Sequence, residues 1–138
     1  MTIRTCQAYV VEWVKSVFGE TVAADKKERT LRFVEEAVEL AQAVGLEVHV
    51  VHRLVDYVFS REKGEPPQEV AGCLVTLFAA AAANGIDVQE QFAIELDRIR
   101  QPEVIERCRR RQNEKREALV AVDTYTERVS EPKSRGWA

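Results

Sequence analysis

The chain has 138 residues, 46% of them hydrophobic, and a formal net charge of −3. This length suits one domain with a packed core, and the small negative charge excludes a general electrostatic attraction to nucleic acid or anionic membranes. Three cysteines, an odd number without paired spacing, favour a reducing cytosol over a disulfide framework. We therefore expect a cytoplasmic protein without a membrane or nucleic-acid partner.

Helical periodicity dominates the first half of the chain. An apolar stripe predicts a first helix over about residues 6–18, ended by Gly19. A second helix is predicted over about residues 26–44, closed by Gly45, and a third over about residues 47–60.

Two prolines mark the start of a fourth helix. Pro66 and Pro67 suit a first helical turn, and Asn84 with Gly85 predicts the C-cap. The sequence between them is apolar nearly all round and rich in alanine, which favours a buried helix over a membrane span.

The character of the chain changes after a fifth helix, which Asp87 begins and which runs to about Arg100. Residues 1–99 carry 10 basic and 16 acidic side chains, whereas residues 100–138 carry 10 basic and 7 acidic ones. We predict a helical domain over residues 1–101 and a charged C-terminal helix with a tail over residues 102–138. The mixed signs favour a solvated helix over a nucleic-acid arm.

No segment shows the alternation of apolar and polar residues that is typical of strands. The predicted fold class is therefore all-α. We expect a bundle of about four to five helices, completed by oligomerisation, because two of the helices carry more apolar surface than a single small bundle can cover.

The second predicted helix contains three acids in the stretch "RFVEEAVELAQAVG". On a helical wheel Glu35, Glu36 and Glu39 fall within an arc of about 100°. Like charges four residues apart on a helix repel by a few tenths of a kcal/mol. Apolar residues cover about half of the circumference, which predicts that this helix lies deep in a bundle.

These acids have two interpretations. One is a solvated face, on which Arg32 forms i,i+4 pairs with Glu28 and Glu36 that offset the repulsion. The other is a hard-cation site, because Mg²⁺ prefers oxygen ligands and is typically held by a few carboxylates together with substrate phosphates.

Other helices offer further polar groups. Glu69, the single acid of the fourth helix, either joins such a site or interacts with the helix dipole in the first turn. In the third helix His49, His52 and Asp56 fall within about 60° of one another. They are compatible with a transition metal, although we favour an exposed polar face with a local His52–Asp56 contact.

Residues 35–40, "EEAVEL", match the E-E-x-x-E-L motif of the all-α nucleoside triphosphate pyrophosphohydrolases, the MazG-like proteins. The longer strings "ERTLRFVEEAVELAQAVG" and "GEPPQEVAGCLVTLFAAAAANGIDVQEQFAIELDRI" resemble a phage and prophage branch of that family. The resemblance covers roughly residues 28–99.

The resemblance implies a helical bundle that assembles as a homodimer or homotetramer and cleaves a nucleoside triphosphate to the monophosphate and pyrophosphate. The cofactor it implies is Mg²⁺, with Mn²⁺ as a possible substitute. It assigns Glu36 and Glu39 as metal ligands, Glu69 as a ligand from a second helix, and Glu35 as the third ligand or the base that activates water.

The chain departs from the family pattern at three positions. The aspartate of the family's E-x-x-D motif falls on Gly72, so that Asp56 or water would have to take its place. The lysine and asparagine that often follow fall on Glu95 and Ile99. Arg32, Arg98 and Arg100 are the candidates that remain for binding phosphate.

Two functions follow from these observations. The first is an Mg²⁺-dependent nucleotide pyrophosphohydrolase. The alternative is a catalytically degenerate MazG-like helical module that binds a nucleotide or a protein partner, and it is favoured by the missing ligand positions.

Overall fold

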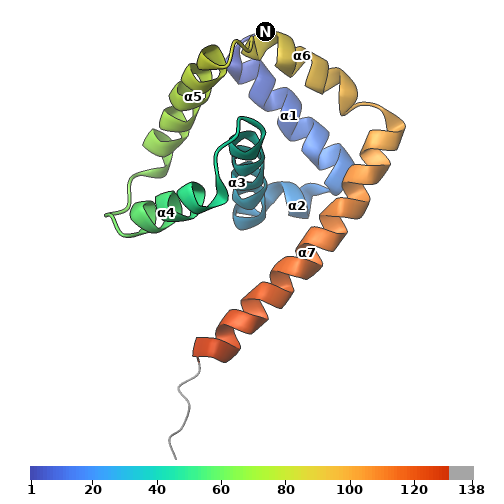
Figure 1. Ribbon diagram of the computed structural model, residues 1–138. Coiled ribbons are helices and arrows are strands. Elements are labelled where there is room, and N and C mark those ends of the chain that lie inside the picture. Colours follow the sequence, from blue (N-terminus) through green and yellow to red (C-terminus); the bar gives the residue numbers. More distant parts are fainter. Residues whose placement is uncertain (131–138) are drawn as a thin grey trace, which may run out of the picture. The chain divides into compact units, whose positions relative to one another are not determined.

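A computed structural model describes the backbone of residues 1–130 and the side chains of residues 1–118 (Figure 1). This part of the chain forms seven helices and no strand, which confirms the all-α prediction. The chain divides into two compact units, Met1–Glu95 and Leu96–Ala138. Residues 131–138, which include most of the predicted tail, lie outside the described residues.

The first unit begins with three connected helices, α1 (Ile3–Phe18), α2 (Glu20–Ala24) and α3 (Lys26–Ala43). Side-chain caps begin two of them: Thr2 Oγ1 accepts a hydrogen bond from the Thr5 amide at 3.2 Å, and Asp25 Oδ1 accepts one from the Glu28 amide at 3.0 Å. The short helix α2 was not predicted, because five residues are too few to show a helical period.

Helices α4 (Val48–Phe59), α5 (Pro66–Ala83) and α6 (Val88–Arg98) follow, each with bounds within two residues of those predicted. Pro66 opens α5 and Asn84 is its C-cap. The positive φ angles of Gly45 (89°) and Gly85 (68°) let the chain turn after α3 and after α5. The Asp87 carboxylate accepts a hydrogen bond from the Glu90 amide at 2.9 Å at the start of α6.

The second unit contains the long helix α7 (Pro102–Ser130). Its first part carries the charged sequence "PEVIERCRRRQNEKRE". The predicted boundary at residue 101 falls in the turn between α6 and α7.

A small aromatic cluster lies where α1, α2 and α3 meet. Trp13 and Phe18 contact edge to face, with ring centroids 5.7 Å apart, and the guanidinium of Arg29 lies 5.5 Å from the Phe18 centroid. Val17 of α1 and Val22 of α2 are buried. These contacts join the start of α3 to the end of α1.

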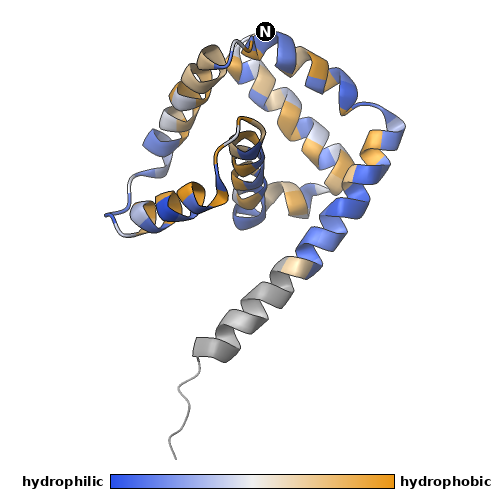
Figure 2. Cartoon of the chain, in the orientation of Figure 1, coloured by the Kyte–Doolittle hydropathy of each residue, from blue (hydrophilic) through white to orange (hydrophobic). Residues whose placement is uncertain are grey.

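The apolar faces of α3, α4 and α5 are largely exposed. Figure 2 colours their hydrophobic residues orange. Phe33 and Val38 of α3 are 51% and 45% exposed, and Val70 and Val75 of α5 are 63% and 68% exposed. The expectations that α3 lies deep in a bundle and that α5 is a buried helix are therefore not met within the described residues.

Among the described residues no single helix is long and apolar enough to cross a membrane.

Candidate metal and ligand site on helix α3

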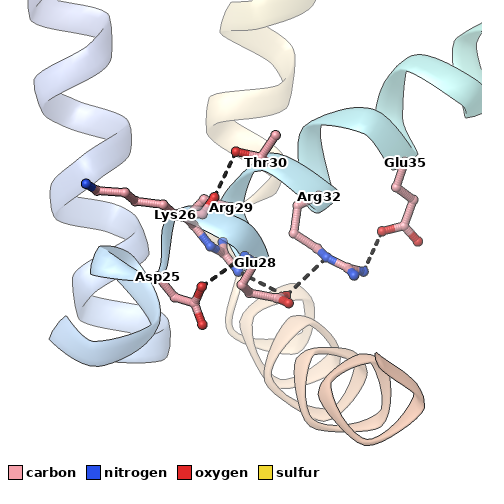
Figure 3. A network of polar contacts seen from close by, with 7 residues as sticks. All are labelled: Asp25, Lys26, Glu28, Arg29, Thr30, Arg32 and Glu35. Carbon is pink, nitrogen blue, oxygen red and sulfur yellow. Dashed lines mark hydrogen bonds and ion pairs between the residues drawn. The ribbon is translucent and has the colours of Figure 1, made fainter. Parts of the chain in front are cut away.

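The first turns of α3 hold a network of paired charges (Figure 3). Arg32 Nη1 donates a 2.6 Å hydrogen bond to Glu35 Oε2, and its Nε lies 3.1 Å from Glu28 Oε1. Arg29 Nη2 lies 3.5 Å from the same Glu28 oxygen. The buried Glu28 side chain, 5% exposed, is therefore held between two guanidinium groups.

This network stabilises the fold at the start of α3, because a buried carboxylate requires nearby positive charge or hydrogen bonds. Burial lowers the pKa of Arg29, and the neighbouring Glu28 opposes that effect. The predicted Glu28–Arg32 pair is confirmed. Arg32, which we expected to bind phosphate, is engaged at both ends of its guanidinium by the carboxylates of Glu28 and Glu35.

Glu36 is exposed, about 100° around α3 from Glu35, and it lines an open-sided cavity of about 440 Å³ between α3, α5 and α6. This volume lies within the usual range of small-molecule sites. Apart from Glu36, the cavity is lined by the following residues: Leu40, Val44, Leu77, Ala80, Ala81, Asn84, Ile86, Val88, Gln91, Phe92 and Glu95. Most of the wall is therefore apolar.

The polar groups of the cavity come from all three helices. Glu36 and Glu95 contribute carboxylates, and Asn84 and Gln91 contribute amides. Carboxylate and amide oxygens are the ligands that hard divalent cations prefer, and apolar walls with an aromatic residue suit a flat organic ring. The arrangement can therefore accommodate a metal at its acidic edge and a ring against its wall.

The other predicted ligands do not line this cavity. Glu39 is exposed on α3, and Asp56 is exposed on α4. Glu69 lies in the first turn of α5, where its carboxylate folds back against Gly64 so closely that a Cβ at residue 64 would collide with it. Across the residues whose side chains are described, no three His, Cys, Asp or Glu residues gather in a group that could hold a metal ion.

The polar face of α4 is exposed, which confirms that part of the interpretation favoured from the sequence. Solvent reaches all three polar residues, His49, His52 and Asp56. His49 contacts Glu47, with 3.2 Å between Nδ1 and Oε2.

The two arginines predicted to bind phosphate after residue 95 belong to the second unit. Arg98 lies in the last turn of α6. Arg100 donates from Nη2 to the Asp97 carboxylate and from Nε to the Leu96 carbonyl at 3.1 Å.

The sequence reasoning missed the position of Glu95 in the cavity. In the sequence Glu95 stood out only as a departure from the family pattern. The spacing of Val88, Gln91, Phe92 and Glu95, at i, i+3, i+4 and i+7, places all four on one helical face and was the signal that could have found it.

Comparison of the chain with models of known protein families, with curated proteins and with solved structures found no match. The motif in α3 and the surroundings of its acids are therefore the observations that bear on function.

Proposed function

We propose that this protein is an Mg²⁺-dependent nucleotide pyrophosphohydrolase of the MazG-like class, which cleaves a nucleoside triphosphate to the monophosphate and pyrophosphate. The observation that carries the proposal is the position of Glu36. This acid belongs to the E-E-x-x-E-L motif, and its side chain lines a cavity large enough for a nucleoside. Base and sugar would lie against the apolar wall, and the phosphates would lie toward the acidic edge.

Glu36 and Glu39 are the proposed metal ligands. They are three residues apart on α3 and are therefore neighbours on the helix surface. Glu69 and Asp56, or water in place of the latter, are the proposed further ligands. The side chain of Glu69 would have to turn away from Gly64 to join them.

The bound Mg²⁺, or Mn²⁺ in its place, would neutralise phosphate charge and position a water molecule at the α-phosphorus. Glu35 is the proposed base. Arg32 binds Oε2 of its carboxylate, and in this scheme the carboxylate would accept the proton of the attacking water. The bond between the α-phosphorus and the oxygen bridging to the β-phosphate then breaks, which releases the monophosphate and pyrophosphate.

Arg32 would act in this scheme by holding Glu35 in position. Phosphate binding by Arg98 and Arg100 stays a prediction from the sequence. Assembly as a homodimer or homotetramer, which the resemblance implies, belongs to the same proposal, and the exposed apolar faces of α3, α4 and α5 support it.

A second candidate function is a non-catalytic helical module that binds a nucleotide or a protein partner. Two observations favour it. Gly72 has no carboxylate to offer, and Glu95 adds a negative charge to the cavity where the family pattern has a lysine.

The proposal is tested by measuring pyrophosphate release from a panel of nucleoside triphosphates with Mg²⁺ or Mn²⁺. Wild type should turn over at least one of them, and Glu36→Gln should lower that turnover at least about 100-fold. Glu62→Gln, which changes an exposed acid in the loop between α4 and α5, is the matched control and should have no effect. Nucleotide binding without turnover in wild type would replace the enzyme with the non-catalytic module.

A further inference from the structure

The cavity between α3, α5 and α6 combines apolar walls with negative charge. Eight of the twelve described residues that line it are apolar, and its two charged side chains are the carboxylates of Glu36 and Glu95. Asn84 and Gln91 add neutral amides, and none of the described lining residues is Lys, Arg or His. Because the lining supplies charge of one sign only, its field favours a ligand of positive charge.

Two of the walls are apolar along most of their length and acidic at one end. On α3 the lining face consists of Glu36, Leu40 and Val44, each four residues from the next. On α6 Phe92 continues the lining face toward Glu95. A ligand that covers such walls is itself apolar along its body and charged at one end.

Glu95 stands beside an aromatic ring on α6. Phe92 precedes it by three residues and Gln91 by four, so the three side chains are neighbours on one face of the helix. Phe92 and Glu95 are both half-buried. An ammonium group gains from both of them, because the carboxylate pairs with its charge and the face of the ring attracts a cation.

The size of the cavity restricts the ligand further. Its volume of about 440 Å³ lies near the lower end of the range of small-molecule sites, roughly 300–1,000 Å³. A single ring with a short chain fits this space. A hydrated metal ion alone would leave the apolar walls uncovered, and a phosphate alone would meet two carboxylates.

We propose that this cavity binds a small organic cation, an ammonium group carried on an aromatic or aliphatic body. Its charge lies at Glu95 and Phe92, and its body covers the apolar walls of α3 and α5. The proposal goes beyond the proposed reaction, in which no amine takes part. A bound amine would compete with the ring of a nucleotide, because both cover the same walls.

The test compares probes that differ in charge and share one ring and nearly one length: phenylbutylamine, phenylbutanol and phenylbutyrate. Each is titrated into chelator-treated protein without nucleotide, at low ionic strength, and binding is followed by amide chemical shifts. The amine should bind with a dissociation constant in the millimolar range or below, at least about fivefold tighter than the alcohol. The carboxylate probe should bind most weakly. Butylamine, which has the charge without the ring, should bind at least about fivefold more weakly than phenylbutylamine.

A matched pair of variants locates the charge recognition. Glu95→Gln keeps the size and helix propensity of the side chain but removes its charge, so the amine should bind within about twofold of the alcohol, and the alcohol should keep its wild-type affinity. Glu90→Gln removes the same charge from α6 at an exposed residue that does not line the cavity, and it should keep the full preference for the amine. Circular dichroism checks the helix content of both variants.

Three results would overturn the proposal. The first is equal affinity of wild type for the amine and the alcohol, or no saturable binding of the amine. The second is a preference for the amine that Glu95→Gln leaves intact, or that both variants reduce equally. The third is butylamine binding as tightly as phenylbutylamine. Since no titration contains a triphosphate or a metal, failure of the proposed reaction leaves these results to be judged separately.

Discussion

The carboxylates of α3 fall into two groups that the sequence does not distinguish. Glu28 and Glu35 are bound by arginines of the same helix, and Glu28 is buried between two of them. Glu36 and Glu39 are both exposed, and Glu36 lines a largely apolar, open-sided cavity. We therefore propose that the two groups have different roles. The arginine-bound acids stabilise the start of the helix, and we propose that the other two hold a metal ion.

The largest expected difference between the two groups of carboxylates is in the rate of pyrophosphate release. Glu36→Gln should lower pyrophosphate release at least about 100-fold, whereas Glu28→Gln should stay within about threefold of wild type when assayed below its melting temperature. Steady-state kinetics on both variants checks this. Equal losses in the two variants would show that the groups do not differ in function.

For the free energy of unfolding we expect the reverse, with the larger loss on substituting an arginine-bound acid. Glu28→Gln removes the charge that neutralises two partly buried guanidinium groups, so the free energy of unfolding should fall by about 2 kcal/mol. Urea unfolding in the absence of metal measures the change. A loss below about 0.5 kcal/mol would mean that the network contributes little to the fold.

A metal ion should affect one group and leave the other unchanged. Mg²⁺ at about ten times its dissociation constant should stabilise wild type by about 1.4 kcal/mol, because it binds the folded state. Glu28→Gln should keep this increase, and Glu36→Gln should lose it. Melting curves with and without Mg²⁺ test the expectation, and a full response in Glu36→Gln would exclude that residue as a ligand.

The smallest effect concerns Glu39 without metal. Glu39→Gln removes a like charge four residues from Glu35 and keeps the helix propensity of the position. The metal-free variant should therefore equal wild type in unfolding free energy or exceed it by a few tenths of a kcal/mol. A clear destabilisation in chelator-treated protein would show that Glu39 has a structural partner.

The helices could be predicted because residues close in the sequence determine where each helix begins and ends. Pro66 opens α5, Gly19 ends α1 and Asp87 caps α6, and each acts through its own backbone or its nearest neighbours. The i,i+4 pair of Glu28 with Arg32 is local as well. Sequence spacing was sufficient for these features.

The cavity could not be predicted because three helices distant in the sequence form it. The motif identified Glu36, but only the arrangement of α5 and α6 brings Asn84 and Glu95 to the same space. The choice of Arg32 for Glu35 depends on side-chain conformation, which helical spacing does not specify. The exposed hydrophobic residues of α3 and α5 also contradicted the expectation of buried helices, because an apolar stripe does not say which molecule covers it.

The most direct test of the division between the two groups is a titration with Mn²⁺, followed by the electron paramagnetic resonance signal of the unbound ion. Wild type and Glu28→Gln should bind about one ion per chain with similar affinity, and Glu39→Gln should bind at least about 10-fold more weakly. If wild type shows no saturable binding, or if Glu39→Gln and Glu28→Gln weaken it equally, Glu36 and Glu39 do not form the proposed metal site.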